Sequence, residues 1–139
     1  MYNLGSVKAE KALVKLSRND FEPDICFFKK EKSDLFQKNT MFFPAPDFVV
    51  EIVSDSTERR DRGVKMADYA LHGVSEYWII DADKEIIEQY VLVGDQYDLH
   101  LKLNSGEISS KAVPGFTIPV KAIFDKTENL ATLQKIIAA

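Results

Sequence analysis

The sequence is poor in the residues that build disulfide-bonded or zinc-binding domains. It has one cysteine, Cys26, so no disulfide can form within the chain. Cys26 lies in the apolar run 25–28, which predicts a buried thiol. The two histidines, His72 and His100, stand far apart and lack the spacing of zinc ligands. We therefore expect neither a disulfide framework nor a zinc site.

Long apolar runs and an excess of basic residues are also missing. No stretch approaches the roughly 20 apolar residues that a membrane helix needs, and no signal-peptide pattern opens the chain. We therefore expect a soluble cytoplasmic protein with no membrane partner. The net charge is -4 and the pI about 5.2, whereas a protein that only coats nucleic acid would usually be basic. An enzyme with an acidic metal site is not excluded, because the cation offsets the local charge.

The overall composition is that of an ordinary globular protein. Its 139 residues, 45% of them apolar and 29% charged, are enough for a sizeable core. No repeat, low-complexity tract or linker divides the sequence. We expect residues 1–139 to form a single domain.

The order of patterned segments predicts the fold class. We expect strands at 11–16 and 25–28, then a loop with a short helix over 29–40. The run Phe-Val-Val-Glu-Ile-Val at 48–53 is typical of a central strand covered on both faces. A helix from near Glu58 to Leu71 should begin at capping side chains in 54–57 and stop at Gly73. A meander over 76–81, 86–93 and 97–103, a short segment ending near Phe124 and a final helix over 128–137 complete an α/β fold with a mixed sheet flanked by helices.

Side-chain periodicity assigns faces within these elements. Asp61, Lys65 and Tyr69 recur every four residues, so they should share one face of the helix. We expect an apolar stripe on that helix to turn to the core instead (Val64, Ala67 and Leu71). Trp78 stands among apolar neighbours in 76–81, which predicts a core position and not a base-stacking role.

Glu51 is the most informative single residue. Burying an ionised carboxylate among valines and isoleucines is costly unless a metal ion or a lysine compensates it. Asp24 begins the neighbouring candidate strand after a proline and could approach Glu51 across the sheet. Asp47, also after a proline, lies four residues before Glu51 and so on the same strand face. Magnesium favours one or two carboxylates with water and phosphate oxygens in the remaining positions, which an Asp24 and Glu51 pair would satisfy. The alternatives are a structural salt bridge or a glutamate at an exposed strand edge.

Lys65 is the candidate cation for such a site. A lysine near a metal-bound water can orient the nucleophile or stabilise the charge that develops on phosphorus. The alternative is an ordinary solvated helix lysine.

The central stretch carries a specific pattern: a proline-aspartate pair that opens an acid-bearing strand, a polar cap, a helix with Asp, Lys and Tyr, and a second strand (Pro46 to Ser54, Ser56, Thr57, Asp61, Lys65, Tyr69, Gly73, Val74, Glu76 to Asp81). This pattern resembles the Uma2 family of endonucleases, which belongs to the PD-(D/E)XK superfamily with the restriction-endonuclease-like fold. Pro23 with Asp24 and the later Pro114, Gly115 and Phe116 match in order and rough spacing. The resemblance covers about Val14 to Phe124.

The resemblance implies roles for individual residues. Asp24 would be the motif aspartate and Glu51 the second acidic residue, both metal ligands. The position of the superfamily's motif lysine falls at Val53, and a valine cannot replace a lysine there. In this family the lysine stands on the following helix instead, and Lys65 matches that position. Asp24, Glu51 and Lys65 are thus the expected catalytic residues, with Asp47 and Tyr69 at supporting family positions.

The activity implied is that of a Mg²⁺- or Mn²⁺-dependent endonuclease that hydrolyses DNA phosphodiester bonds. We expect DNA as the partner and leave a homodimer open. Family members usually carry a further N-terminal segment with a helix and an acidic residue, and we expect this chain to be incomplete there. One alternative is a non-catalytic DNA-binding or assembly domain of the same fold. Another is an interaction domain whose acids form structural salt bridges.

Overall fold

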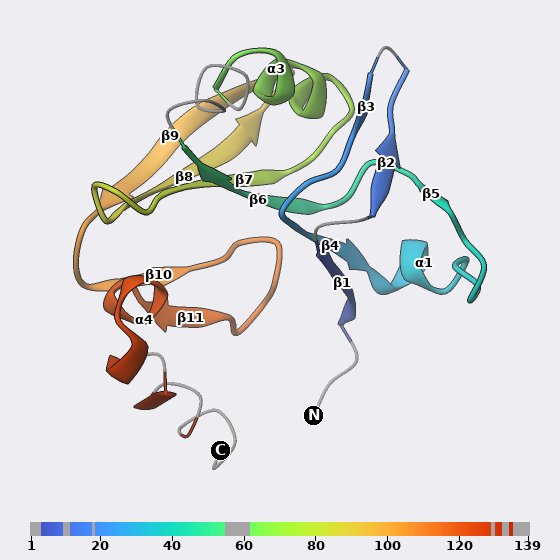
Figure 1. The fold of residues 1–139 in the computed structure, drawn as a ribbon. Helices are drawn as coiled ribbons and strands as arrows, with labels where there is room; N and C mark the ends of the chain where they lie inside the picture. The colour runs from blue at the N-terminus through green and yellow to red at the C-terminus, as the bar shows by residue number, and fades with distance from the viewer. Residues whose placement is uncertain are drawn as a thin grey trace.

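A six-stranded mixed sheet forms the centre of the molecule (Figure 1). The computed structural model describes residues 4–9, 12–17, 19–54, 62–128, 130–131 and 134. The strand order is β1-β4-β6-β7-β8-β9, with bounds β1 (Gly5–Ala9), β4 (Ile25–Lys29), β6 (Phe48–Val53), β7 (Glu76–Asp81), β8 (Ile86–Val93) and β9 (Gln96–Leu103). β6 and β7 pair in parallel, and the other neighbours pair antiparallel. The predicted fold class is confirmed.

Smaller elements surround this sheet. A three-stranded sheet joins β2 (Leu13–Lys15), β3 (Asp20–Phe21) and β5 (Phe42–Phe43), and a hairpin joins β10 (Glu107–Ser109) and β11 (Thr117–Pro119). The helices are α1 (Lys30–Ser33), α3 (Val64–Leu71) and α4 (Lys121–Phe124). The predicted strands at 25–28, 48–53, 76–81, 86–93 and 97–103 are confirmed to within a residue. The predicted helix start at 54–58 and much of the final helix fall on residues outside the described part of the chain.

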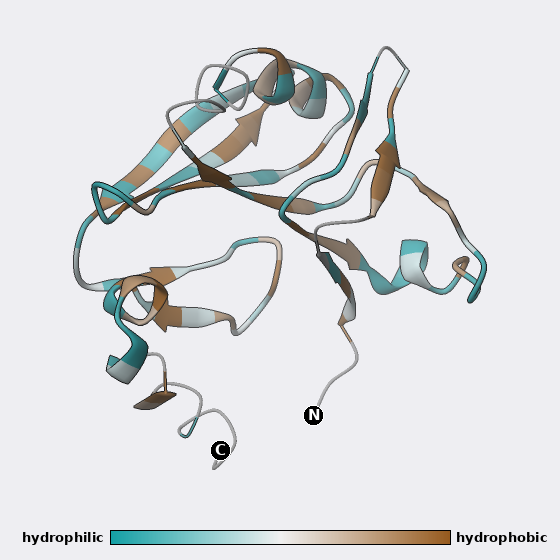
Figure 2. Cartoon of the chain, viewed as in Figure 1, coloured by the Kyte–Doolittle hydropathy of each residue, from teal (hydrophilic) through white to brown (hydrophobic). Residues whose placement is uncertain are grey.

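The sheet has a core on each face. Figure 1 shows α3 on one side of the sheet and the β10–β11 hairpin with α4 on the other. On β6, Val49 belongs to the core under α3, whereas Phe48 and Val50 belong to the core over the hairpin. Trp78 is 2% exposed in this second core, so its predicted core position is confirmed. The mostly brown course of β6 in Figure 2 agrees with its burial on both faces.

The rotation of α3 about its axis differs from the prediction. Val64 and Leu71 are 55% and 56% exposed, and Ala67 is exposed as well, so the predicted core stripe is wrong. The buried residues are Asp68, Tyr69 and Ala70. Tyr69 packs between the rings of Phe21 and Tyr77, at centroid distances of 5.3 and 5.9 Å. A buried tyrosine removes far more area from water than a valine or alanine, so the aromatic face turns to the sheet.

The end of α3 is fixed by both backbone and side-chain contacts. Gly73 has φ 76°, the left-handed conformation that ends helices, so the predicted stop is confirmed. His72 accepts a hydrogen bond from Ser17 N at Nε2 (3.1 Å) and donates from Nδ1 to Asp68 O (2.7 Å). Asp68 also accepts a short hydrogen bond from Asn19. These bonds fasten the β2–β3 hairpin to α3. None of the helices in the described residues is long and apolar enough to cross a bilayer.

Candidate active site

The centre of the candidate site is an ion pair between the sheet and α3. Glu51 projects from β6 toward α3 and is 2% exposed. Lys65 descends from the first turn of α3 and its Nζ lies 2.9 Å from Glu51 Oε2. The Nζ of Lys65 also lies 5.9 Å from the centroid of the Phe21 ring. The structure therefore brings together the acid and the lysine that the sequence singled out, in a largely water-excluded position.

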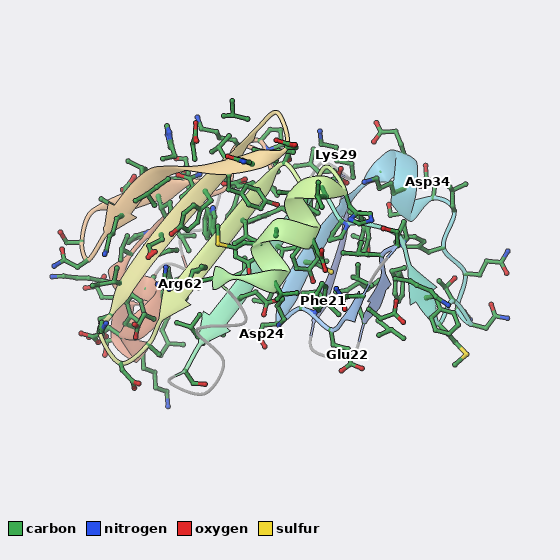
Figure 3. The ribbon with its side chains drawn as sticks, turned by 90° about the horizontal axis from the view of Figure 1, so that it is seen from above. Phe21, Glu22, Asp24, Lys29, Asp34 and Arg62 are labelled. Carbon is green, nitrogen blue, oxygen red and sulfur yellow. The ribbon has the colours of Figure 1, made fainter. Side chains whose placement is uncertain are left out.

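Asp24 stands at the entry to β4, the strand that pairs with β6. The β4–β6 register pairs Ile25 with Val50, so one further step places Asp24 opposite Glu51. Residues opposite one another on antiparallel strands project from the same face. Asp24 Oδ2 accepts a hydrogen bond from Ile52 N at 2.7 Å, which holds its carboxylate against β6. Figure 3 looks down on α3 and shows Asp24 and Arg62 near the beginning of that helix.

Asp47 does not join this group. It precedes Glu51 by four residues, which is about 13 Å along a strand. Its Oδ2 accepts from Lys29 N at 2.7 Å and its Oδ1 lies 3.2 Å from Lys32 Nζ. A shared strand face was therefore not enough to bring Asp47 to the site, and its carboxylate instead caps the junction of β4 and α1.

The donor set limits what metal the site could hold. Within the described residues, no group of three or more His, Cys, Asp or Glu side chains is placed to bind a metal ion. Asp24 and Glu51 supply only hard oxygen ligands. A pair of carboxylates is what Mg²⁺ uses when water and substrate phosphate complete its octahedral shell, so these residues fit Mg²⁺ or Mn²⁺ and not zinc.

A second acid–cation pair lies beside the first and was not predicted. Arg62 Nη1 lies 2.7 and 2.6 Å from the two carboxylate oxygens of Glu88, and Tyr90 donates to the same carboxylate at 2.9 Å. Burial would raise the pKa of Glu88, but the hydrogen bonds and charge of Arg62, with Tyr90 and Lys102, outweigh it and lower the pKa. Glu51 and Glu88 both pair in register with Ile79, on opposite sides of it. The hairpin predicted over 76–93 could have revealed this row, because its register sets Glu88 against Ile79.

Of the other residues singled out from the sequence, Tyr69 and Cys26 are placed and Asp61 is not. Tyr69 follows Lys65 by one turn and is fully buried among aromatic rings. Asp61 lies outside the described residues. The predicted buried thiol is confirmed, since Cys26 is 1% exposed. Its burial, followed by the negative charge of Glu51, raises the pKa of Cys26 to about 12, so the thiol stays protonated.

Glu76 is another buried acid, and it lies on the opposite face of the sheet. Its Oε2 accepts from Trp78 Nε1 and Gln89 Nε2, both at 2.6 Å. Its Oε1 accepts from Ser110 Oγ, Lys111 N and Ala112 N at 2.7 to 3.0 Å. Five donors occupy this carboxylate, so Glu76 anchors the 105–120 region to β7 and is not free to bind a ligand.

Comparison with known proteins places this geometry in a family context. A family model described as "Uma2: Putative restriction endonuclease" matches residues 3–121. A crystal structure of a putative nuclease belonging to DUF820 from Anabaena variabilis is similar in fold, with a TM-score of 0.72 and 18% sequence identity. That similarity covers 87% of this chain and 68% of the other. The search among curated proteins found no match.

Proposed function

The chain belongs to the Uma2 family, and from this we propose that it hydrolyses DNA phosphodiester bonds with a divalent cation held by Asp24 and Glu51. The observation that carries the proposal is the buried Glu51 carboxylate, whose Oε2 lies 2.9 Å from Nζ of the helix lysine Lys65. Removing two opposite charges from water costs several kcal/mol per ion, roughly what their attraction returns. A buried ion pair therefore adds little net stability, and a catalytic role explains its presence better than a stabilising one.

The residues divide the work of hydrolysis between them. Asp24 and Glu51 would hold Mg²⁺ or Mn²⁺, which when bound supplies positive charge to a phosphate oxygen and to the attacking water. Lys65 carries only hydrogen-bond donors, so it would orient the water oxygen or stabilise the negative charge that grows on the phosphate. The Arg62–Glu88 pair would hold the segment that leads into α3, and so would help to position Lys65 above the sheet.

A non-catalytic DNA-binding or assembly domain is the second candidate. The observation in its favour is that Lys65 lies at ion-pairing distance from Glu51 and compensates its charge. In that case the pair is structural, and removing either partner should destabilise the fold because the other charge is left buried.

Cleavage assays on matched variants separate the two candidates. We would incubate supercoiled plasmid, single-stranded DNA and RNA with the parent, Glu51→Gln, Lys65→Ala and the control Glu22→Gln, in Mg²⁺, Mn²⁺ or EDTA. Glu22 is exposed on the segment that leads to Asp24, so the control removes the same charge without touching the site. We expect metal-dependent cleavage of DNA by the parent and the control, and a fall of about 10²-fold or more in both site variants.

Thermal unfolding of the same proteins completes the test. Under the proposal, Mn²⁺ raises the melting temperature of the parent and Glu51→Gln abolishes that rise, because bound ligand stabilises the folded state. If the parent cleaves nothing in any metal, and its melting temperature does not change when metal is added, the non-catalytic candidate is favoured instead.

A further inference from the structure

A row of residues crosses the main sheet on the face that carries α3. Its members are register partners in turn along β6, β7, β8 and β9: Glu51, Ile79, Glu88 and Lys102. Register partners project from the same face of a sheet, so Lys102 shares the face of Glu51. Three strand spacings separate these two residues, which is about 14 Å. The row therefore runs from the candidate site to a lysine on the edge strand β9.

A small polar pocket lies at the Lys102 end of this row. Three cations from three parts of the chain line it: Arg62 from the segment that leads into α3, Lys84 from the β7–β8 turn and Lys102 from β9. The volume of the pocket is about 40 Å³. Pockets for drug-sized ligands measure roughly 300–1,000 Å³, so this pocket suits one small charged group and not a nucleoside.

The two acids of this pocket are already engaged, which leaves its lining with a net charge of +1. Both carboxylate oxygens of Glu88 bind Arg62, at 2.7 and 2.6 Å. Asp81 Oδ1 accepts a hydrogen bond from Lys84 N at 3.0 Å and so holds the turn. Lys84 and Lys102 are exposed, and within the described part of the chain neither forms an ion pair. Their ammonium groups are therefore available to an anion.

We propose that Lys84 and Lys102 bind a backbone phosphate of the DNA strand, a few nucleotides away from the scissile phosphate. This inference rests on the proposed function, which supplies DNA as the ligand. Successive phosphates of one strand advance about 3.4 Å along a duplex, so about 14 Å along the row corresponds to about four nucleotides. Phosphate contacts fix the register and orientation of a bound strand, and this second contact sets how the strand crosses the sheet.

Salt-dependent DNA binding tests this contact. We would measure the affinity for a labelled duplex by fluorescence anisotropy over a range of salt concentrations, in EDTA and in Ca²⁺, for the parent and the double variant Lys84→Gln, Lys102→Gln. The matched control is Lys111→Gln, Lys121→Gln. Both control lysines are exposed, and they belong to the segment from β10 to α4, which Figure 1 shows on the other side of the sheet. The control therefore removes the same charge from the opposite face.

The double variant should bind DNA about tenfold or more weakly than the control at about 0.1 M salt. Its plot of log affinity against log salt concentration should be shallower by about 1 to 2, because each lost phosphate contact removes about 0.9 from the slope. The gain in affinity from EDTA to Ca²⁺ should be the same in the double variant and the parent, since the lysines act apart from the metal.

Equal affinities and salt slopes in the double variant and the control would overturn the inference, and cleavage of DNA by the parent would then leave the proposed function standing. A shallower slope in the double variant of a parent that cuts no DNA would support the phosphate contact and reject hydrolysis. The inference is also wrong if the pocket serves a free anion. In that case millimolar inorganic phosphate raises the melting temperature of the parent and not that of the double variant, while the two bind DNA equally.

Discussion

Buried carboxylates in this protein have surroundings that differ with their task. Glu76 is enclosed by five donors from side chains and backbone, all at hydrogen-bonding distance. Glu51, equally buried, faces a lysine from another element. A carboxylate surrounded by fixed dipoles is stabilised in place, whereas one opposite a flexible cation can exchange that cation for a metal. The same residue type therefore serves architecture on one face and candidate chemistry on the other.

Replacement of Glu76 by glutamine should destabilise the fold strongly. The amide nitrogen of Glu76→Gln would meet donors where the carboxylate accepted, leaving at least one buried N–H unsatisfied. The expected loss is about 2 kcal/mol or more in the free energy of unfolding, measured in urea. Glu107→Gln is the matched control, because Glu107 is exposed on β10 in the same part of the fold. Equal free energies of unfolding in the two variants would show that the hydrogen bonds to Glu76 do not contribute to stability.

Glu88 should make stability depend on acid pH. Its pKa is lowered below the ordinary 4.5 in the folded protein, so folding favours its ionised form. The stability it contributes is then fully present above about pH 5 and is lost as the pH falls through the folded value. We expect the difference in unfolding free energy between the parent and Glu88→Gln to be constant from pH 7 to 5 and to shrink below pH 4.5. The exposed Glu31→Gln should give no such pH-dependent difference.

At the scale of the element, α3 shows what local pattern can and cannot determine. Its existence, its end at Gly73 and the shared face of Lys65 and Tyr69 follow from spacing and from the glycine stop. Its rotation does not, because two candidate faces compete for the sheet. The face with Tyr69 is the buried one because Tyr69 packs on Phe21 and Tyr77. These two residues belong to other segments of the chain, so the sequence of the helix alone does not reveal the contact. Lys65 reaches Glu51 as a consequence of that rotation.

Paired substitutions on α3 test this orientation. Tyr69→Ala should lower the unfolding free energy by about 3–5 kcal/mol, the range for a buried aromatic side chain. Leu71→Ala, on the exposed face, should change it by no more than about 0.5 kcal/mol. Chemical denaturation of both variants gives the comparison. The opposite ranking would restore the aliphatic stripe as the buried face and would turn Lys65 away from Glu51.

At the scale of the whole molecule, the fold class could be predicted from the sequence because most strands of the main sheet are visible as short local patterns of apolar residues. The central strands β6 and β7 and the meander from β7 to β9 are local patterns. The order of strands and the small β2, β3 and β5 sheet depend on contacts between distant segments, which no local pattern contains. The candidate site shows the same division. Glu51 could be identified as an acid in an apolar run, whereas the pairing of Arg62 with Glu88 depends on where the chain that leads into α3 lies over β8.

The charge of the whole chain leads to the last prediction, on DNA binding. A net charge of -4 repels a polyanion, so the chain must gain positive charge at its site to hold a phosphate there. A unit charge 4 Å away is worth about 4 kcal/mol near a protein surface, so even a partial gain from a cation at Asp24 and Glu51 should raise affinity at least about tenfold. We expect this rise by fluorescence anisotropy when EDTA is replaced by Ca²⁺, which also takes oxygen ligands, at matched ionic strength. Glu51→Gln should lose the rise and Glu22→Gln should keep it. Equal affinity of the parent in EDTA and Ca²⁺ would place the DNA contacts elsewhere and favour the non-catalytic candidate.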